Sequence, residues 1–420
     1  QVLGYPHHDE LSQVSLNNPV MLRHASGHSL FANKAAMDAV GIDKDTPNPA
    51  GGEIVRDEDG KAIGVFEETA MGLFQDAYND YLETLSPEEK VKNWQRKISL
   101  AEQDCLKNGI TSFQDAGASF EELERYEKMA EAGELNIRLW SMIGGAQDSL
   151  AQKADKYPLI GVGNQYFTCR SIKGYADGAL GAFGAWMLKP YNDKPSAHGQ
   201  NVTPLPQLKS VANYAFDNDL QMCIHAIGDR ANRVVLDIFE DNFQSDTTKK
   251  DLRWRVEHAQ HINPKDIPRF REMGVIASMQ GIHCTSDAPF VEKRLGTDRA
   301  RSGAYPWRTL LDAGVIIANG TDAPVEDIDP FACLYASVTR KRTDTGMEFF
   351  PEQSMTRAEA LNSYTLGNAF AAFEEKEKGT LEAGKLADMI VLSNDLTNCT
   401  DEEILTTKVL MTIIGGVVKY

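Results

Sequence analysis

Short apolar segments alternate with amphipathic segments along most of the chain. The stretch PEEKVKNWQRKISLAEQDCLKNG has apolar residues at helical spacing and ends at Gly109, and the apolar run ITSFQD follows it. Glycine favours the position just after a helix because it adopts positive φ at little cost. We therefore predict a helix that ends near Gly109 and a strand directly after it.

The same order of helix and strand recurs towards the C-terminus. Further helices are predicted at RANRVVLDIFEDNF and YPWRTLLDAG. The segments predicted as strands are ITSFQD, LNIRLWSMI, RSIKGYAD, LQMCIHA, RWRVEHA, GVIASMQ and VIIANGTD. Strands that alternate with helices favour a parallel sheet, and this many in one stretch favour a (β/α)8 barrel. An open doubly wound sheet is the alternative, but no G-x-G-x-x-G segment follows an early strand.

Polar residues stand at or near the ends of four predicted strands: Lys173, His225, His258 and Asp322. In a (β/α)8 barrel the C-terminal strand ends meet at one mouth, where active sites are built. Each residue alone has an ordinary interpretation: a lysine in an ion pair, two hydrogen-bonded barrel histidines and an aspartate that caps a turn. Their common position at strand ends predicts that they face one another.

The chemistry of these four residues is mutually consistent. Imidazole nitrogens suit zinc, and a nearby carboxylate can bind the metal or take a proton from a water molecule. Lys173 fits such a site only when it is not a cation, and carboxylation by carbon dioxide would turn its amine into a carbamate with two anionic oxygens. Glu257 precedes His258, so strand alternation predicts that Glu257 points the opposite way, towards the surrounding helices.

Charge and composition exclude several classes of protein. The formal net charge is -18, whereas nucleic-acid binders and proteins that bind anionic membranes need basic surface. The chain contains no apolar run of the length needed to span a membrane, and its first residues do not resemble a secretory signal. The 6 cysteines form no C-x-x-C pair and are interpreted as reduced thiols of a cytoplasmic protein, although spacing alone leaves disulfide pairing open.

Four segments in one order resemble those of a known family. SIKGYADGALG, IHAIGDRAN, VEHAQHI and NGTDAPVEDIDP are similar to segments of the amidohydrolase superfamily, specifically the amidohydrolase 3 group that includes N-substituted formamide deformylase. The resemblance extends from PVMLRHASGHSLFANKAAM to GTLEAGKLADMIVLSN and VLMTIIGGVVKY. It implies a TIM-like (β/α)8 barrel, a small β-sandwich, and hydrolysis of amide-like C–N bonds by a metal-activated water.

The resemblance also assigns roles to individual residues. It implies that Lys173 is the carboxylated ligand of strand four, that His225 and His258 are the ligands of strands five and six, and that Asp322 is the general base and a metal ligand of strand eight. The implied cofactor is a divalent metal, with zinc expected, and one or two ions in the intact family site.

The sequence departs from the family in one respect. Superfamily members carry a His-x-His pair at the end of strand one, and this sequence contains none. We therefore expect that strand one and part of the sandwich are missing, and that metal occupancy is reduced. The predicted domains are an insertion region at 1–85, a catalytic barrel at 86–373 and the C-terminal part of the sandwich at 374–420. An open barrel edge would be filled by residues 1–30, with PVMLR as the best candidate strand, or would favour a homodimer.

Four histidines near the start of the sequence are poor substitutes for the missing pair. His7 and His8 are adjacent, so as strand neighbours they would point to opposite faces and could not chelate one ion together. His24 and His28 have a spacing that would suit a metal on a helix, but the serine and glycine between them disfavour a helix.

Three residues are candidates for contact with substrate: His28, Asp177 and Arg230. His28 resembles a family position near the pocket. The alternative for Arg230 is an ion pair with an acidic residue at a helix start, where Asp229 would act as a cap.

We expect a metal-dependent hydrolase of an amide or formamide-like bond, acting on a small-molecule substrate and impaired if the His-x-His region is absent. One alternative is a catalytically inactive relative with a binding or regulatory role, which absence of metal would favour. The other is a metal-dependent deaminase, which shares the ligands and differs in the pocket. The identity of the substrate depends on loops whose geometry the sequence does not give.

Overall fold

The computed structural model describes residues 5–23, 29–144 and 150–420, and its chain divides into two compact units. The first unit comprises Gln1–Leu100 and the second Ala101–Tyr420. The predicted boundary between residues 85 and 86 falls within the first unit, between α3 (Gly72–Thr84) and α4 (Pro87–Lys107). Helix α4 matches the first predicted helix. Gly109, two residues after its end, has a φ of 73°, the positive value that favours glycine.

The described part of the first unit is built around an antiparallel sheet with the strand order β1-β2-β4-β3. Its strands are β1 (Met21–Arg23), β2 (Ser29–Ala32), β3 (Gly52–Arg56) and β4 (Ala62–Glu68), and its other elements are α1 (Asp9–Val14), α2 (Lys34–Ala39), η1 (Thr69–Met71) and α3. The PVMLR segment forms β1 and pairs with β2 in this sheet. The prediction that PVMLR fills the barrel edge is therefore wrong, because its backbone partners lie in its own hairpin.

The second unit contains the parallel sheet that the sequence predicts. All seven predicted segments are strands: β5 (Ser112–Ala118), β6 (Arg138–Ile143), β8 (Phe167–Tyr175), β9 (Gln221–Ala226), β10 (Arg255–His258), β11 (Ile276–Gln280) and β12 (Ile317–Gly320). Adjacent strands pair in parallel in the order β12-β11-β10-β9-β8-β6-β5, and the short β7 (Leu159–Gly161) pairs antiparallel with β8.

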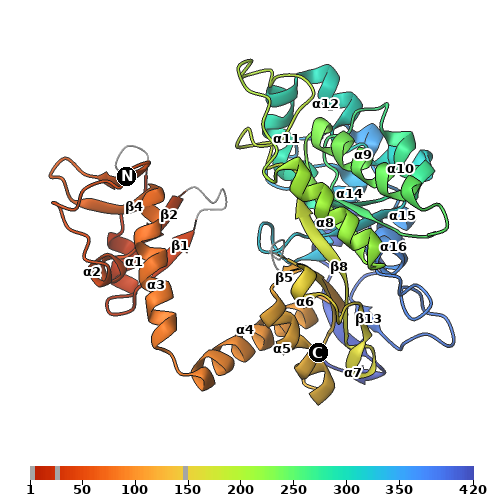
Figure 1. The fold of residues 1–420 in the computed structure, drawn as a ribbon, viewed down its shortest axis with the longest axis horizontal. Coiled ribbons are helices and arrows are strands. Elements are labelled where there is room, and N and C mark those ends of the chain that lie inside the picture. The colour runs from red at the N-terminus through yellow and green to blue at the C-terminus, as the bar shows by residue number, and fades with distance from the viewer. Residues whose placement is uncertain (1–4, 24–28, 145–149) are drawn as a thin grey trace. The chain divides into compact units, whose positions relative to one another are not determined.

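Helices follow most of these strands, as in a barrel. Helices α8 (Leu205–Asp217), α9 (Asp229–Ser245) and α10 (Ile267–Met273) run along the outside of the sheet (Figure 1). The two further predicted helices are found as α9 and α13 (Trp307–Asp312). The helices of this unit beyond α4 are α5 (Phe120–Ala132), α6 (Leu150–Lys153), α7 (Val162–Gln165), α8 (Leu205–Asp217), α9 (Asp229–Ser245), α10 (Ile267–Met273), α11 (Gly281–Leu295), α12 (Thr297–Gly303), α13 (Trp307–Asp312), α14 (Pro330–Thr339), η2 (Pro351–Gln353), α15 (Arg357–Tyr364), α16 (Leu366–Ala371) and α17 (Asp401–Leu405).

The sheet curls, so that strands that are not neighbours touch through their side chains. The Arg255 guanidinium on β10 donates a hydrogen bond of 2.6 Å to Gln114 Oε1 on β5 and lies 5.4 Å from the ring centroid of Trp140 on β6. Such contacts across the concave side confirm the predicted TIM-like barrel architecture. Among the described strands, β5 and β12 end the path, and no pairing joins them.

Glu257 lies on the concave side of this sheet. Its carboxylate pairs with Arg255, with 2.7 Å between Arg255 Nε and Glu257 Oε1, and both side chains are buried. The prediction that Glu257 points towards the surrounding helices is therefore wrong. The reason is that β10 turns at its end: His258 has a φ of 72° and Ala259 a φ of 44°, so His258 leaves the regular alternation of the strand.

The C-terminal segment forms a small sheet with the order β13-β14-β15, in which β13 is Met389–Leu392, β14 is Val409–Ile414 and β15 is Val417–Val418. Both pairings are antiparallel. A buried ion pair ties this segment to the barrel, with 2.6 Å between Arg138 Nε and Asp388 Oδ2. These strands lie within the predicted domain at 374–420.

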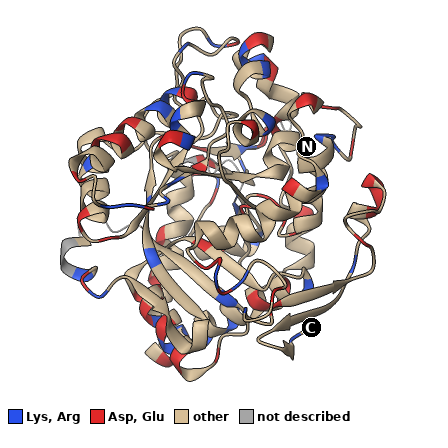
Figure 2. Cartoon of the chain, turned by 90° about the vertical axis from the view of Figure 1, so that its right-hand side faces the viewer, with Lys and Arg blue, Asp and Glu red and all other residues tan. Residues whose placement is uncertain are grey.

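The structure also shows how the charged residues are distributed (Figure 2) and that the cysteines are unpaired. Acidic and basic residues are interspersed along the helices (Figure 2). The six cysteines, all in described segments, are free thiols. In the described segments, no helix has the length and apolar character that crossing a bilayer requires.

Candidate metal centre

Lys173 lies on β8 with its side chain directed to the concave side of the sheet. It is paired in register with Cys223 of β9, and only 7% of the residue is exposed. Its Nζ lies 5.1 Å from the ring centroid of Tyr175. The Lys173 charge adds to the effect of burial that lowers the pKa of His225, and it opposes the effect of burial that raises the pKa of Asp322. The amine therefore lies among the other predicted site residues.

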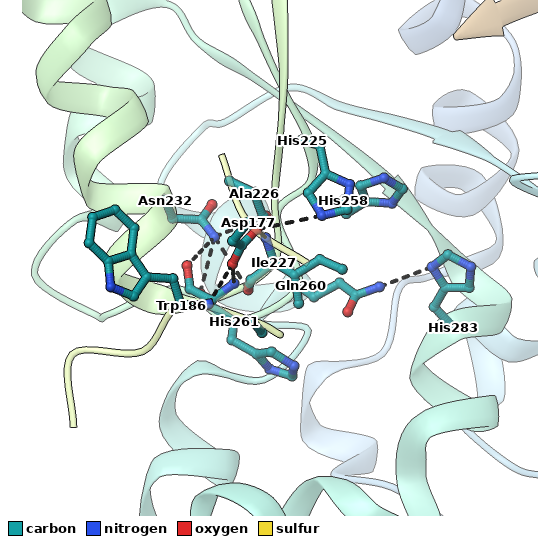
Figure 3. Close-up of polar contacts among 12 residues, drawn as sticks. Asp177, Trp186, His225, Ala226, Ile227, Asn232, His258, Gln260, His261 and His283 are labelled. Carbon is teal, nitrogen blue, oxygen red and sulfur yellow. Dashed lines mark hydrogen bonds and ion pairs between the residues drawn. The ribbon is translucent and has the colours of Figure 1, made fainter. Parts of the chain in front are cut away.

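His225 and His258 bring their rings together at the ends of adjacent strands. The ring centroids are 4.5 Å apart, at an interplanar angle of 65°. His225 Nε2 is buried without a hydrogen bond and lies 3.5 Å from Asp177 Oδ1 (Figure 3). His258 Nδ1 is 2.8 Å from Gln280 Oε1. A metal-binding histidine is commonly oriented in this way by an acceptor on its other ring nitrogen.

The structure adds a residue that the sequence analysis did not single out, His283. It lies in the first turn of α11, directly after β11, and is 7% exposed. Nitrogen or oxygen atoms of His258, His283 and Asp322 lie within 4.8 Å of one another, close enough to share one cation. The sequence signal was present in QGIHC, where a histidine follows the end of a predicted strand by three residues.

Burial sets the protonation of these groups. Desolvation lowers the pKa of His225 to about 3, aided by the Lys173 charge, and lowers that of His283 to about 4. The pKa of His258 is also held well below its usual value by burial. The imidazoles are therefore neutral at pH 7, and each keeps one nitrogen lone pair that can accept a hydrogen bond or bind a metal. Burial raises the pKa of Asp322 to about 6, against the opposing effect of Lys173.

Asp177 is a buried acceptor that holds the turn after β9. Its carboxylate accepts backbone N–H groups of Ile227 at 2.9 Å, Gly228 at 2.8 Å and Trp186 at 2.7 Å. The side chain is 0% exposed. We therefore propose a positioning role for Asp177 beside His225, in place of the predicted contact with substrate.

The other two residues predicted to contact substrate are Arg230 and His28. Arg230 is exposed, and its guanidinium carbon lies 5.2 Å from the ring centroid of Trp186. The N-cap of α9 is Gly228, and the predicted cap Asp229 instead accepts the backbone N–H of Leu188 at 2.7 Å. His28 lies outside the described residues, so its predicted contact with substrate stays a prediction.

The adjacent histidines of the first unit do not separate as predicted. The ring centroids of His7 and His8 are 4.7 Å apart at 32°, and a carboxylate oxygen of Asp9 joins them within 4.8 Å. The prediction of opposite faces is wrong because these residues precede a helix and are not in a strand. This group belongs to the first unit and the strand-end residues to the second.

The donor set of the second unit fits a divalent cation. His225 Nε2 is buried and has no hydrogen-bond partner in the described part of the chain, which is costly unless a ligand meets it. Neutral imidazole nitrogens together with a carboxylate are typical ligands of zinc and similar ions.

Known proteins resemble the chain over nearly its whole length. The amidohydrolase family matches residues 3–420. Protein LONG AFTER FAR-RED 3 of Arabidopsis thaliana is 30% identical over 97% of this chain and 70% of that protein, and N-substituted formamide deformylase of Arthrobacter pascens is 30% identical over 98% and 75%. A crystal structure of an uncharacterized metal-dependent hydrolase from Pyrococcus horikoshii OT3 has a TM-score of 0.75 and 26% identity, covering 95% of this chain and 76% of that one.

The family match agrees with the curled parallel sheet of the second unit. The metal-dependent hydrolases among the structural relatives imply a divalent metal. The chain therefore belongs to the amidohydrolase family.

Proposed function

We propose that this protein hydrolyses a C–N bond of an amide or formamide-like small molecule at the Lys173–His225–His258–Asp322 site. The observation that carries the proposal is the convergence of these four residues from strand ends far apart in the sequence. The name of the Arthrobacter pascens relative, N-substituted formamide deformylase, suggests the class of substrate.

The cation is proposed to be held by Lys173, His225 and His258. The two imidazoles are neutral and supply lone pairs, and Lys173 becomes an anionic ligand when its amine adds carbon dioxide and loses a proton. Three protein ligands suffice for a catalytic zinc site, and Asp322 stands close enough to be an additional ligand. A divalent cation in this position polarises a carbonyl and lowers the pKa of a bound water.

Asp322 is proposed as the general base. Its carboxylate takes a proton from the water whose oxygen attacks the carbonyl carbon, and then delivers that proton to the nitrogen as the C–N bond breaks. The products are a carboxylic acid and an amine. Burial raises the pKa of Asp322, which favours its acceptance of a proton in this role.

The test is turnover of N-phenylformamide, which releases aniline and formate, together with elemental analysis of the purified chain and its native mass. We expect about one divalent ion per chain and an added carbon dioxide that Lys173→Ala removes. Asp322→Asn is expected to keep the ion and lower kcat by about 10²–10⁴-fold. The matched control is Asp217→Asn, an exposed carboxyl at the end of α8, which should leave turnover unchanged.

Two outcomes would contradict the proposal. A chain that binds no ion after reconstitution with Zn²⁺ would be a non-catalytic relative. Release of ammonia from ring substrates, with no hydrolysis of formamides or other amides, would identify a deaminase.

A further inference from the structure

Two glutamines hold two site imidazoles by opposite kinds of hydrogen bond. His258 Nδ1 faces the amide oxygen of Gln280 at 2.8 Å. In contrast, His283 Nδ1 faces the amide nitrogen of Gln260 at 3.0 Å (Figure 3). All four side chains are buried, with exposures of 4–8%. An amide oxygen only accepts a hydrogen bond and an amide nitrogen only donates one. The two imidazoles are therefore held in opposite tautomers.

The tautomers determine what each histidine offers to the site. His258 carries its proton on Nδ1 and keeps the lone pair of Nε2, as a metal ligand requires. His283 accepts at Nδ1, so its proton is on Nε2. A protonated ring nitrogen cannot bind a cation, and it donates a hydrogen bond instead.

The Nε2–H group of His283 has no acceptor in the described structure. The nearest carboxylate oxygen, Asp322 Oδ2, is 3.6 Å away, which is too long for a hydrogen bond. Buried N–H groups are almost always paired, so an unpaired one beside a proposed base indicates that a ligand supplies the acceptor.

We propose that His283 is a neutral hydrogen-bond donor to the carbonyl oxygen of the substrate, with its tautomer fixed by Gln260, and that it is not a ligand of the cation. The proposal rests on the proposed function, because it places the scissile carbonyl beside Asp322. As water adds, this oxygen becomes negative, and the fixed donor stabilises it without reorganisation.

The tautomer is measured directly by ¹⁵N NMR of histidine-labelled protein, with and without Zn²⁺. The His283 signals are assigned from their loss in His283→Ala. We expect a protonated Nε2 and an unprotonated Nδ1 in both states. In Gln260→Glu the carboxylate accepts from Nδ1 and the proton should move there, whereas the neutral Gln260→Met removes the donor without adding a charge and should release the tautomer preference. Protonation of Nδ1 in the unaltered protein would overturn the proposal.

Zn²⁺ titration and kinetics with N-phenylformamide separate a donor from a ligand. His283→Ala should bind Zn²⁺ like the unaltered protein, lower kcat by about 10²–10³-fold and change KM little, because one oxyanion donor is lost. His258→Ala is the matched comparison and should lose Zn²⁺ binding. Loss of Zn²⁺ from His283→Ala would show that His283 is a ligand. If the unaltered protein does not hydrolyse the probe, the proposed function fails, and the NMR and Zn²⁺ results still decide the role of His283.

Discussion

Asp287 is a buried carboxyl whose environment opposes its charge. It lies on α11 and accepts a hydrogen bond of 2.6 Å from the hydroxyl of Tyr305, which is 1% exposed. Burial raises the pKa of Asp287 from 3.8 to about 6, with a smaller contribution from the charge of Glu326. The folded protein therefore holds a proton here that the unfolded chain has already released.

This shift predicts a loss of stability as pH rises. Between pH 4 and pH 7 the folded state binds more protons at Asp287 than the unfolded state, so the free energy of unfolding falls with pH. The stabilisation is complete below pH 4, and up to about 3 kcal/mol of it is lost above pH 6. Chemical unfolding across this range should show that Asp287→Asn loses this part of the pH dependence, because an amide does not titrate.

Tyr305→Phe tests the cause of that pH dependence. The hydroxyl of Tyr305 favours the ionised carboxylate, so its removal should extend the loss of stability to higher pH. A free energy difference between Asp287→Asn and the unaltered protein that is constant from pH 4 to pH 7 would contradict the assignment.

The residues of the site were predictable where they end strands. Lys173, His225, His258 and Asp322 were identified because the strand ends of a barrel converge. His283 was missed because it stands three residues beyond the end of its strand, in the first turn of α11, and not in the strand itself. The orientation of Glu257 was wrong because the positive φ of His258 was not visible in the sequence.

At the scale of elements, a buried ion pair helps to attach the C-terminal sheet to the barrel. Arg138, at the start of β6, donates to both carboxylate oxygens of Asp388, which precedes β13. Both side chains are 4% exposed. Asp388 also accepts the backbone N–H of Gly415 at 2.8 Å, so it fixes the β14–β15 turn as well.

Removal of the Asp388 carboxylate should loosen this attachment. Asp388→Ala leaves the Arg138 charge buried and unpaired, a change that typically costs about 3–5 kcal/mol. Hydrogen exchange should show faster exchange in β13 and β14 than in the central strands β9 and β10. The matched control is Asp344→Ala, which breaks an exposed pair with Arg342 and should cost less than about 1 kcal/mol. Equal effects of the two variants would show that the Arg138 pair does not hold the sheet.

The strands of the barrel were predictable because each is a short apolar run after an amphipathic helix. All seven predicted segments are strands in the expected parallel order. The pairing partner of PVMLR was not predictable from its own sequence, because a short apolar strand fits an antiparallel hairpin as well as a barrel edge. Its partner, β2, begins at Ser29, and pairing between distant segments is not contained in local periodicity.

At the scale of the whole molecule, the two compact units carry separate groups of side chains that could hold a metal ion. The strand-end site lies in the second unit, whereas His7, His8 and Asp9 lie in the first. A ligand that binds only the folded form stabilises the part of the protein that contains its site, by about 2.7 kcal/mol at a free concentration of 100 times Kd.

Zn²⁺ should therefore protect one unit and not the other. In hydrogen exchange we expect slower exchange in β8 and β9 on addition of Zn²⁺, no change in α3, and reversal by a chelator. Lys173→Ala should abolish the protection, because the proposed ligand of the ion is lost. His8→Ala, which alters only the first unit, should leave the protection of β8 and β9 intact. Slower exchange confined to the first unit would place the ion at His7, His8 and Asp9 and would refute a strand-end metal centre.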